Sequence, residues 1–228
     1  MLFHNRHQAG QLLAARLMPY AGRPEVLVLA LPRGGVVVGV EVAEVLNAQL
    51  DVFVVRKLGV PGHEELGVGA VASGGIRALN ESLIQDLHIS QEVIEAISAS
   101  EWQELERRER IYRRDRPFPD VKERIVILVD DGIATGATMR AAALAVHHLR
   151  PKRTVIAVPV APLSTCAELG DLVDEVVCIA MPEVFYAIGQ WYEDFSQITD
   201  EQVAEMLERA AHREDCSGAA VAVVSRCW

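Results

Sequence analysis

The chain has 228 residues, half of them hydrophobic, and its formal net charge at pH 7 is −10. This length and apolar content fit one large domain with a sizeable core, or one domain with a small subdomain. The acidic balance argues against nonspecific binding to nucleic acids or to anionic membranes. Backbone amides and a few placed cations can still bind an anion locally, so small anionic ligands are not excluded.

The sequence favours a cytoplasmic protein that neither enters nor crosses a membrane. The N-terminal segment MLFHNRHQAG has no apolar signal region, and no apolar run is long enough to span a bilayer. The four cysteines show no CxxC spacing and no matching histidine pattern. We therefore expect buried or free thiols in a reducing compartment at Cys166, Cys178, Cys216 and Cys227.

Helices and apolar strands alternate in the first half of the chain. The run VLVLAL at 26–31 is typical of a strand buried on both faces of a parallel sheet. Two glycines and a proline in KLGVPGHEE, residues 57–65, predict a loop, and SGG between two apolar runs predicts a hairpin. The expected elements are a helix at about 5–20, a strand at 26–31, a helix at about 36–46, a strand at 52–55, hairpin strands at 66–72 and 76–79, and a long helix at about 90–114.

The second half continues the alternation. It is expected to hold strands at 125–129, 154–158 and 175–179, and helices at 138–149 and from 199 to about 212, where Thr199 and Gln202 resemble a capping box. This order predicts a Rossmann-like α/β fold, with a parallel central sheet, flanking helices and a small hood. We expect one domain over residues 1–212. It comprises a core, a hood with a flexible loop at about 57–80, and the long helix at about 90–114. Residues 213–228 form a tail without an assigned element.

An acidic loop, DDGIATGAT at residues 130–138, follows the strand at 125–129. Ligands of open parallel sheets bind at the carboxyl ends of strands, and glycines followed by a helix N-terminus can bind a phosphate. Neither a Walker A loop nor a dinucleotide fingerprint is present. Carboxylates suit hydroxyl groups or hydrated Mg²⁺ beside that phosphate, which indicates a ribose phosphate. The alternative is an ordinary turn capped by Asp131, which leaves Asp130 at a buried strand end without a role.

From Ile125 to Thr138 the chain resembles the phosphoribosylpyrophosphate (PRPP) motif of the type I phosphoribosyltransferases, with several aliphatics, two acids and a small-residue loop containing TGxT. From about residue 3 to 212 it resembles a bacterial group of phosphoribosyltransferases of unsettled acceptor, through LPRGGVVVG, VRKLGVPGHEELGVGAVASGG and WYEDFSQITDEQV. The resemblance implies Mg²⁺-dependent transfer of phosphoribosyl from PRPP to a nucleobase-like nitrogen acceptor, with release of pyrophosphate.

The resemblance also assigns roles by position. It implies that Asp130 and Asp131 hold the ribose hydroxyls and hold Mg²⁺ through water or the ligand. The loop around the 5′-phosphate comprises Gly132, Ile133, Ala134, Thr135, Gly136, Ala137 and Thr138. The pyrophosphate loop comprises Arg33, Gly34 and Gly35 and often carries a non-proline cis peptide in this fold. Arg56 and Lys57 match basic residues that reach the pyrophosphate, and 58–65 match a mobile loop. The implied catalytic set is Asp130, Asp131, Arg33 and Lys57.

The chemistry of the residues agrees with these roles, because a departing pyrophosphate needs cations and N–H donors. The alternative to a functional role is that Arg33 is a surface residue on a tight turn. In the same way, Arg56 and Lys57 could be residues of a solvated strand end. The charged segment EWQELERRERIYRR is interpreted as a solvated helix with i,i+4 ion pairs. A dimer contact or a hood over the active site is the alternative for that helix.

Aromatic residues gather near the C-terminus, after the last predicted strand. We expect a stacking wall for a planar acceptor at Phe185, Tyr186 and Trp191. Packing of the C-terminal segment over the core is the alternative, and Trp191 could instead lie at the subunit contact of a homodimer. A PRPP-binding regulator without turnover, or a hydrolase of nucleotides or sugar phosphates, is the alternative function.

Overall fold

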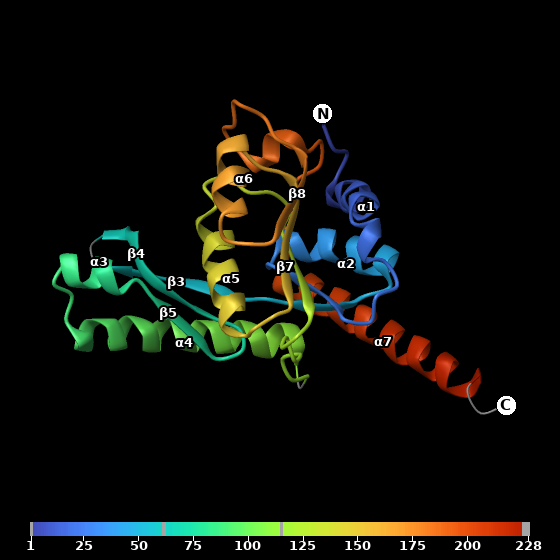
Figure 1. Ribbon diagram of the computed structural model, residues 1–228, viewed down its shortest axis with the longest axis horizontal. Helices are drawn as coiled ribbons and strands as arrows, with labels where there is room; N and C mark the ends of the chain where they lie inside the picture. The colour runs from blue at the N-terminus through green and yellow to red at the C-terminus, as the bar shows by residue number, and fades with distance from the viewer. Residues whose placement is uncertain (1, 61–62, 115, 225–228) are drawn as a thin grey trace.

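The structure is a computed structural model that describes residues 2–60, 63–114 and 116–224. A five-stranded parallel sheet in the order β2-β1-β6-β7-β8 forms its centre (Figure 1). A separate antiparallel sheet has the order β3-β4-β5. The strands are β1 Val26–Ala30, β2 Gln49–Val52, β3 Val55–Val60, β4 His63–Ala72, β5 Ile76–Leu79, β6 Ile125–Val129, β7 Arg153–Val160 and β8 Glu175–Ala180.

Helices cover both faces of the central sheet. They are α1 Arg6–Arg16, α2 Gly34–Leu46, α3 Glu81–Asp86, α4 Gln91–Arg113, α5 Ala137–His148, α6 Leu163–Gly170 and α7 Asp200–Val224, with short 3-10 turns η1 Met18–Tyr20 and η2 Ile188–Trp191. Helices α1, α2 and α7 lie on one side, and α5 and α6 lie on the other (Figure 1).

Alternation along β1 shows how the strands divide the core into two layers. Val26 and Val28 pack into the cluster that includes residues of α1, α2 and α7. Leu27 and Leu29 pack into the cluster that includes residues of α5 and α6. Successive strand side chains point to opposite faces, so a strand covered on both sides must be apolar throughout. Both β1 and β6 are buried along their whole length.

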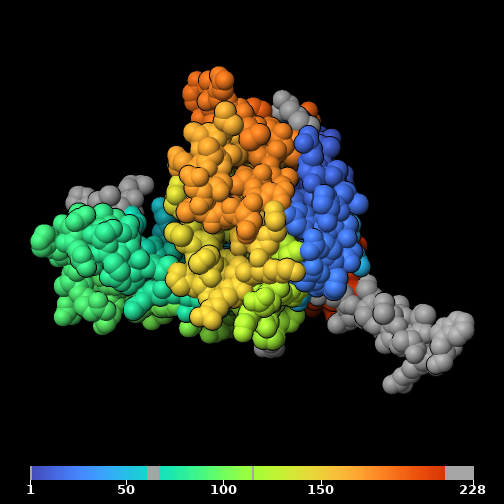
Figure 2. Space-filling model, in the orientation of Figure 1, coloured from blue at the N-terminus to red at the C-terminus, as the bar shows by residue number. Residues whose placement is uncertain are grey.

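Strands β3–β5 and helices α3 and α4 form a lobe that we call the hood. It extends sideways from the central sheet and lies beside α5 (Figures 1 and 2). Arg113, at the end of α4, joins this lobe to the core. Its Nε atom donates to Asp51 Oδ1 at 2.8 Å, and its Nη2 atom donates to the carbonyl of Val52 at 2.5 Å and to Ser73 Oγ at 3.2 Å. Helix α4 is thereby fixed at the carboxyl end of β2.

The predicted fold class is confirmed, and the strand at 125–129 has the expected bounds. The predicted hairpin around SGG is present as β4 and β5. The strand expected at 52–55 is wrong: β2 ends at Val52 and β3 begins at Val55. The apolar pattern of β2 is interrupted by the polar residues Gln49 and Asp51, so the sequence does not indicate a strand there. In the structure Asp51 is buried and paired with Arg113.

Other boundaries also differ from the prediction. The expected loop at 57–65 is largely strand, because β3 pairs with β4 in antiparallel register; residues 61–62 lie outside the described part. Short helices α3 and α6 were not predicted. The helix expected to end near 212 continues as α7 to Val224, so most of the tail extends this helix and 225–228 lie outside the described residues.

Candidate functional site

The first loop of the site follows β1 and contains a cis peptide bond between Pro32 and Arg33. Arg33 is exposed and immediately precedes α2, whose first residues are Gly34 and Gly35. A Cβ atom on Gly34 would lie 1.9 Å from Asp131 Oδ2. Glycine is therefore required here because the loop after β1 is packed directly against the acidic loop after β6.

The neighbouring glycine makes an equally close approach. A Cβ atom on Gly35 would lie 2.8 Å from the Cα atom of Asp130 and 2.9 Å from the carbonyl oxygen of Val129. Both contacts are with backbone atoms, which cannot move aside as a flexible side chain can. The two predicted loops therefore meet at the carboxyl edge of adjacent strands β1 and β6, as the predicted site requires.

Asp131 is held by a buried ion pair with Arg6 of α1. Arg6 Nε lies 2.7 Å from Asp131 Oδ2, and the two side chains are 9% and 11% exposed. The Nη1 atom of Arg6 donates to the carbonyl of Ser196 at 2.8 Å, and its guanidinium lies 3.8 Å from the ring centroid of Phe195. The pair thus connects the acidic loop to both the N-terminal helix and the segment before α7.

Asp130 lies at the end of β6 and accepts a hydrogen bond from the Asp131 backbone N–H at 2.8 Å. Burial raises the pKa of Asp130 well above its ordinary value, and the charge of Asp131 raises it further. Burial also raises the pKa of Asp131, while Arg6 opposes that rise. This pair of carboxyl groups is stabilised in its charged form by a hydrogen-bond donor or a cation, which vicinal hydroxyls or a metal ion can supply.

The rest of the acidic loop forms an open cradle. Ile133 is buried, and its N–H donates to the carbonyl of Val160 at 2.9 Å, which fixes the loop to β7. Gly136 has φ of 76° and precedes the first turn of α5, a left-handed conformation that glycine adopts without strain. Ala134 and Thr135, which directly precede Gly136, are exposed. Free N–H groups at a helix N-terminus attract anions, so the geometry suits a phosphate.

Arg56 and Lys57 are neighbours on β3 and have different surroundings. Arg56 contacts α4, where its Nε atom lies 2.6 Å from Glu101 Oε2. Lys57 is exposed and lines a groove of about 630 Å³ that also includes Thr135 of the acidic loop. The groove lies where the hood meets α5 (Figure 2). Lys57 therefore shares this groove with the acidic loop, whereas Arg56 faces α4.

The aromatic residues expected to stack on an acceptor pack largely with one another. Phe185 and Trp191 are stacked, with ring centroids 6.4 Å apart and an interplanar angle of 9°. Both are partly buried against a small cluster that contains Tyr192. Tyr186 is 81% exposed. Packing of the C-terminal segment therefore accounts for Phe185 and Trp191, and a stacking role for the three residues stays a prediction.

Sequence reasoning missed two residues that support the site, Arg6 and Tyr192. The Tyr192 hydroxyl donates to the carbonyl oxygen of Asp131 at 2.5 Å, and its side chain is buried. No local pattern marks Arg6, which lies in the polar segment HNRH and is 125 residues from its partner. The concentration of aromatics before α7 was a signal for Tyr192, but it was interpreted as an acceptor site.

We expect Tyr192→Phe to lower the free energy of unfolding by about 1–2 kcal/mol, because the carbonyl of Asp131 would lose a buried donor. Urea denaturation measures the difference. Tyr186→Phe is the matched control, because it removes a hydroxyl from an exposed side chain and should leave stability unchanged. Equal stability of the two variants would show that the Tyr192 hydroxyl does not support the acidic loop.

Comparisons with known proteins agree with this geometry. A family model described as phosphoribosyl transferase domain matches residues 2–195. The crystal structure of TT1426 from Thermus thermophilus is 44% identical, with a TM-score of 0.83, and the match covers 91% of this chain and 98% of that one. Proteins from two strains of Mycobacterium tuberculosis, each named "Putative phosphoribosyl transferase", are 43% identical over 220 residues.

The parallel sheet, the paired loops and the hood define the type I phosphoribosyltransferase fold. Because the family model spans most of the sequence, the chain belongs to the phosphoribosyl transferase domain family. The alignment covers 96% of this chain and 49% of each mycobacterial relative, so the chain spans about half the length of those relatives. Within the described residues, no helix has the length and apolarity needed to cross a membrane.

Proposed function

We propose that the protein transfers a phosphoribosyl group from PRPP to a nitrogen acceptor and releases pyrophosphate. The observation that carries this proposal is the junction of the two loops, where Gly34 and Gly35 approach Asp131 and Asp130 without room for a side chain. One loop supplies backbone amides and Arg33 beside the other loop, which supplies two acids and a phosphate cradle. A ribose with a phosphate on one side and a diphosphate on the other needs this combination.

The described residues have separate tasks in such a reaction. Asp130 and Asp131 accept hydrogen bonds from the ribose hydroxyls, and the loop from Gly132 to Thr138 binds the 5′-phosphate. Arg33 and Lys57 provide positive charge as the bond from C1′ to the diphosphate oxygen breaks. The reaction passes through an oxocarbenium-like sugar, so the hood has the further task of excluding water from the site.

The donor set also fits Mg²⁺, the cofactor that the family implies. Asp130 and Asp131 offer oxygen ligands, and in the described part of the chain no group of three or more His, Cys, Asp or Glu side chains could hold a metal ion. Mg²⁺ is usually bound through one or two carboxylates, waters and substrate phosphates. When bound, Mg²⁺ would offset the negative charge of the diphosphate. PRPP would therefore supply part of the coordination.

The acceptor is a planar nitrogen heterocycle in this proposal. Its support is the family together with the aromatic segment from Phe185 to Trp191, which follows β8 and is thus at the carboxyl edge of the sheet. Fold alone does not fix a substrate, so the base is identified by screening. We also propose that the protein forms a homodimer and acts in the cytoplasm.

Calorimetric titration with PRPP and Mg²⁺ tests the proposal first, followed by a screen of bases for pyrophosphate release. We expect Asp130→Asn with Asp131→Asn to weaken PRPP binding at least tenfold, about 1.4 kcal/mol, because the ribose loses both charged acceptors. The double variant Asp86→Asn with Asp171→Asn removes the same charge from exposed positions and should bind normally.

Three results would contradict the proposal. Unchanged PRPP affinity in the folded double variant of Asp130 and Asp131 would remove their ribose role. Phosphate or ribose 5-phosphate formed without an acceptor would indicate a hydrolase, and binding without turnover against any base would indicate a regulator.

A further inference from the structure

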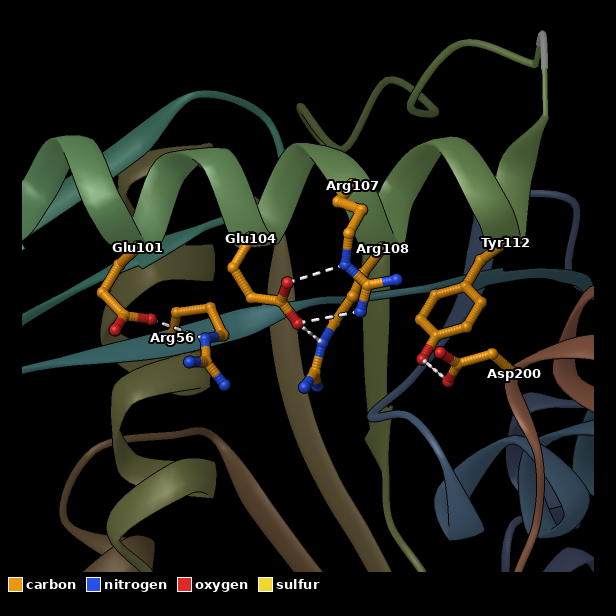
Figure 3. Close-up of polar contacts among 7 residues, drawn as sticks. All are labelled: Arg56, Glu101, Glu104, Arg107, Arg108, Tyr112 and Asp200. Carbon is orange, nitrogen blue, oxygen red and sulfur yellow. Dashed lines mark hydrogen bonds and ion pairs between the residues drawn. The ribbon is translucent and has the colours of Figure 1, made fainter.

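Helix α4 presents a stripe of polar side chains to β3 and to the start of α7. Glu101, Glu104, Arg108 and Tyr112 are spaced by three or four residues, so they share one face of the helix. Figure 3 shows these side chains on the same side of α4, in a row with Arg56 of β3 and Asp200 of α7. The stripe is partly buried, and the charged residues in it are paired.

Arg56 and Arg108 are held in the same way. Glu101 Oε2 lies 2.6 Å from Arg56 Nε, and Glu104 Oε1 lies 2.7 Å from Arg108 Nε. Each arginine is about one-third exposed, with 31% of its side chain accessible. Within the described residues, the Nη atoms of these two arginines donate no hydrogen bond. A carboxylate on Nε fixes the orientation of the guanidinium and leaves its outer N–H groups available.

Arg107 differs from these two, although it follows the same helix. Its Nε and Nη2 atoms bind the two oxygens of Glu104 at 2.7 and 3.0 Å, so its guanidinium is already paired in a bidentate manner. Arg107 and Arg108 lower the pKa of Glu104 to about 2. Glu104 therefore stays charged at neutral pH and holds both arginines.

The C-terminal part of the stripe lies next to the carboxyl end of β2 and the start of α7. Tyr112 is buried and donates to Asp200 Oδ1 at 2.7 Å. Its neighbour Arg113 donates to the carbonyl of Val52, which ends β2, the strand beside β1. Burial raises the pKa of Tyr112, and the positive charges of Arg108 and Arg33 both oppose that rise. Helix α4 therefore ends beside the carboxyl edge of the central sheet, where the loop that carries Arg33 follows β1.

We propose that Glu101 and Glu104 orient Arg56 and Arg108 as a clamp for a diphosphate anion, so that α4 contributes Arg108 to the site beside Arg33. Guanidinium groups with free Nη donors bind phosphate oxygens in a bidentate manner. Glu101 and Glu104 are three residues apart, roughly 4.5 Å along the helix axis, and the two arginines that they bind lie on the same side of α4 (Figure 3). This inference rests on the proposed function for its ligand, and Glu101 and Glu104 are positioning residues in it.

The competing explanation is that these ion pairs only attach β3 to α4 and stabilise α4 itself. Partly exposed ion pairs contribute little to stability. If the pairs were only structural, the affinity for an anion would not depend on Arg108. Isothermal titration with magnesium pyrophosphate and, separately, with ribose 5-phosphate distinguishes the two explanations. Arg110→Ala is the matched control, because it removes the same charge from the same helix at an exposed position about 200° around the axis from Arg108.

We expect Arg108→Ala to weaken pyrophosphate binding at least tenfold and to leave ribose 5-phosphate binding within twofold. Arg110→Ala should bind both ligands within twofold of the unchanged protein. Glu104→Gln should weaken pyrophosphate binding several-fold, although Arg108 is still present. Arg108→Lys keeps the charge but lacks the planar guanidinium, so it should also bind pyrophosphate several-fold more weakly. This variant replaces Arg108→Ala if the alanine variant does not fold.

Pyrophosphate affinity that is the same in Arg108→Ala and Arg110→Ala would overturn the clamp. Failure of the unchanged protein to bind pyrophosphate would overturn it as well. If pyrophosphate binding depends on Arg108 but no base accepts phosphoribosyl from PRPP, the clamp stands and the proposed transferase activity fails. The two hypotheses are therefore separated by the same set of variants.

Discussion

Gly34→Ala is expected to weaken PRPP binding at least a hundredfold, about 2.7 kcal/mol. The new Cβ atom would lie 1.9 Å from Asp131 Oδ2 and 2.9 Å from Arg6 Nε, well inside van der Waals contact. The carboxylate must rotate away, which separates it from Arg6 and from its proposed place beneath the ribose. Calorimetric titration with PRPP and Mg²⁺ measures the loss.

A control separates this effect from a general cost of adding a methyl group. Gly170, at the end of α6, has no heavy atom within 4 Å of an added Cβ, apart from its chain neighbours and its own helix backbone, and it is exposed. Gly170→Ala should therefore leave both PRPP affinity and the midpoint of thermal unfolding unchanged. Wild-type affinity in a folded Gly34→Ala protein would mean that the position of Asp131 does not determine PRPP binding.

The sequence marks the two loops of the candidate site more clearly than the elements that support them. Five aliphatic residues in a row define β6, and charges placed directly after a buried strand mark Asp130 and Asp131 as unusual. These signals are local, because strand burial and the strand–loop–helix junction occupy one continuous segment. The close approach of Gly34 and Gly35 to that segment follows from the parallel order of β1 and β6.

Signals that depend on distant partners cannot be read in the same way. Arg6 and Asp131 form their ion pair although they are 125 residues apart in the sequence. Neither residue alone indicates the other, since a single arginine in a polar N-terminal segment is usually solvated. The segment 57–65 contains two glycines and a proline, and antiparallel pairing of β3 with β4 makes its described residues strand. The role of α4 was similarly ambiguous, because a charged helix has the same sequence pattern whether it faces solvent or a site.

The largest effect on stability is expected for Arg113→Met. Arg113 and Asp51 are 3% and 5% exposed, and their side chains are joined at 2.8 Å between Nε and Oδ1. Removing one partner of a buried pair leaves an uncompensated charge and typically costs about 3–5 kcal/mol. We therefore expect the free energy of unfolding at pH 7 to fall by about that amount, as measured by urea denaturation.

Arg114→Ala is the neighbouring control, because its pair with Glu208 is largely exposed, at 57% and 43%, and should be worth no more than about 1 kcal/mol. A loss as small as this in Arg113→Met would contradict the view that Arg113 anchors the hood to the core. Asp51→Asn combined with Arg113→Met should recover part of the loss, since no buried charge is then left.

The pH dependence of the Arg113→Met variant gives an independent check. Burial raises the pKa of Asp51, and Arg113 is the largest influence that opposes the rise. Without Arg113 the folded-state pKa rises further above the unfolded value of about 3.9. A raised folded-state pKa contributes stability that is fully present below the unfolded pKa and is lost as pH rises through the folded pKa. The loss in free energy of unfolding, relative to the unchanged protein, should therefore be smaller at pH 5 than at pH 7. A loss caused only by poorer packing would be the same at both pH values.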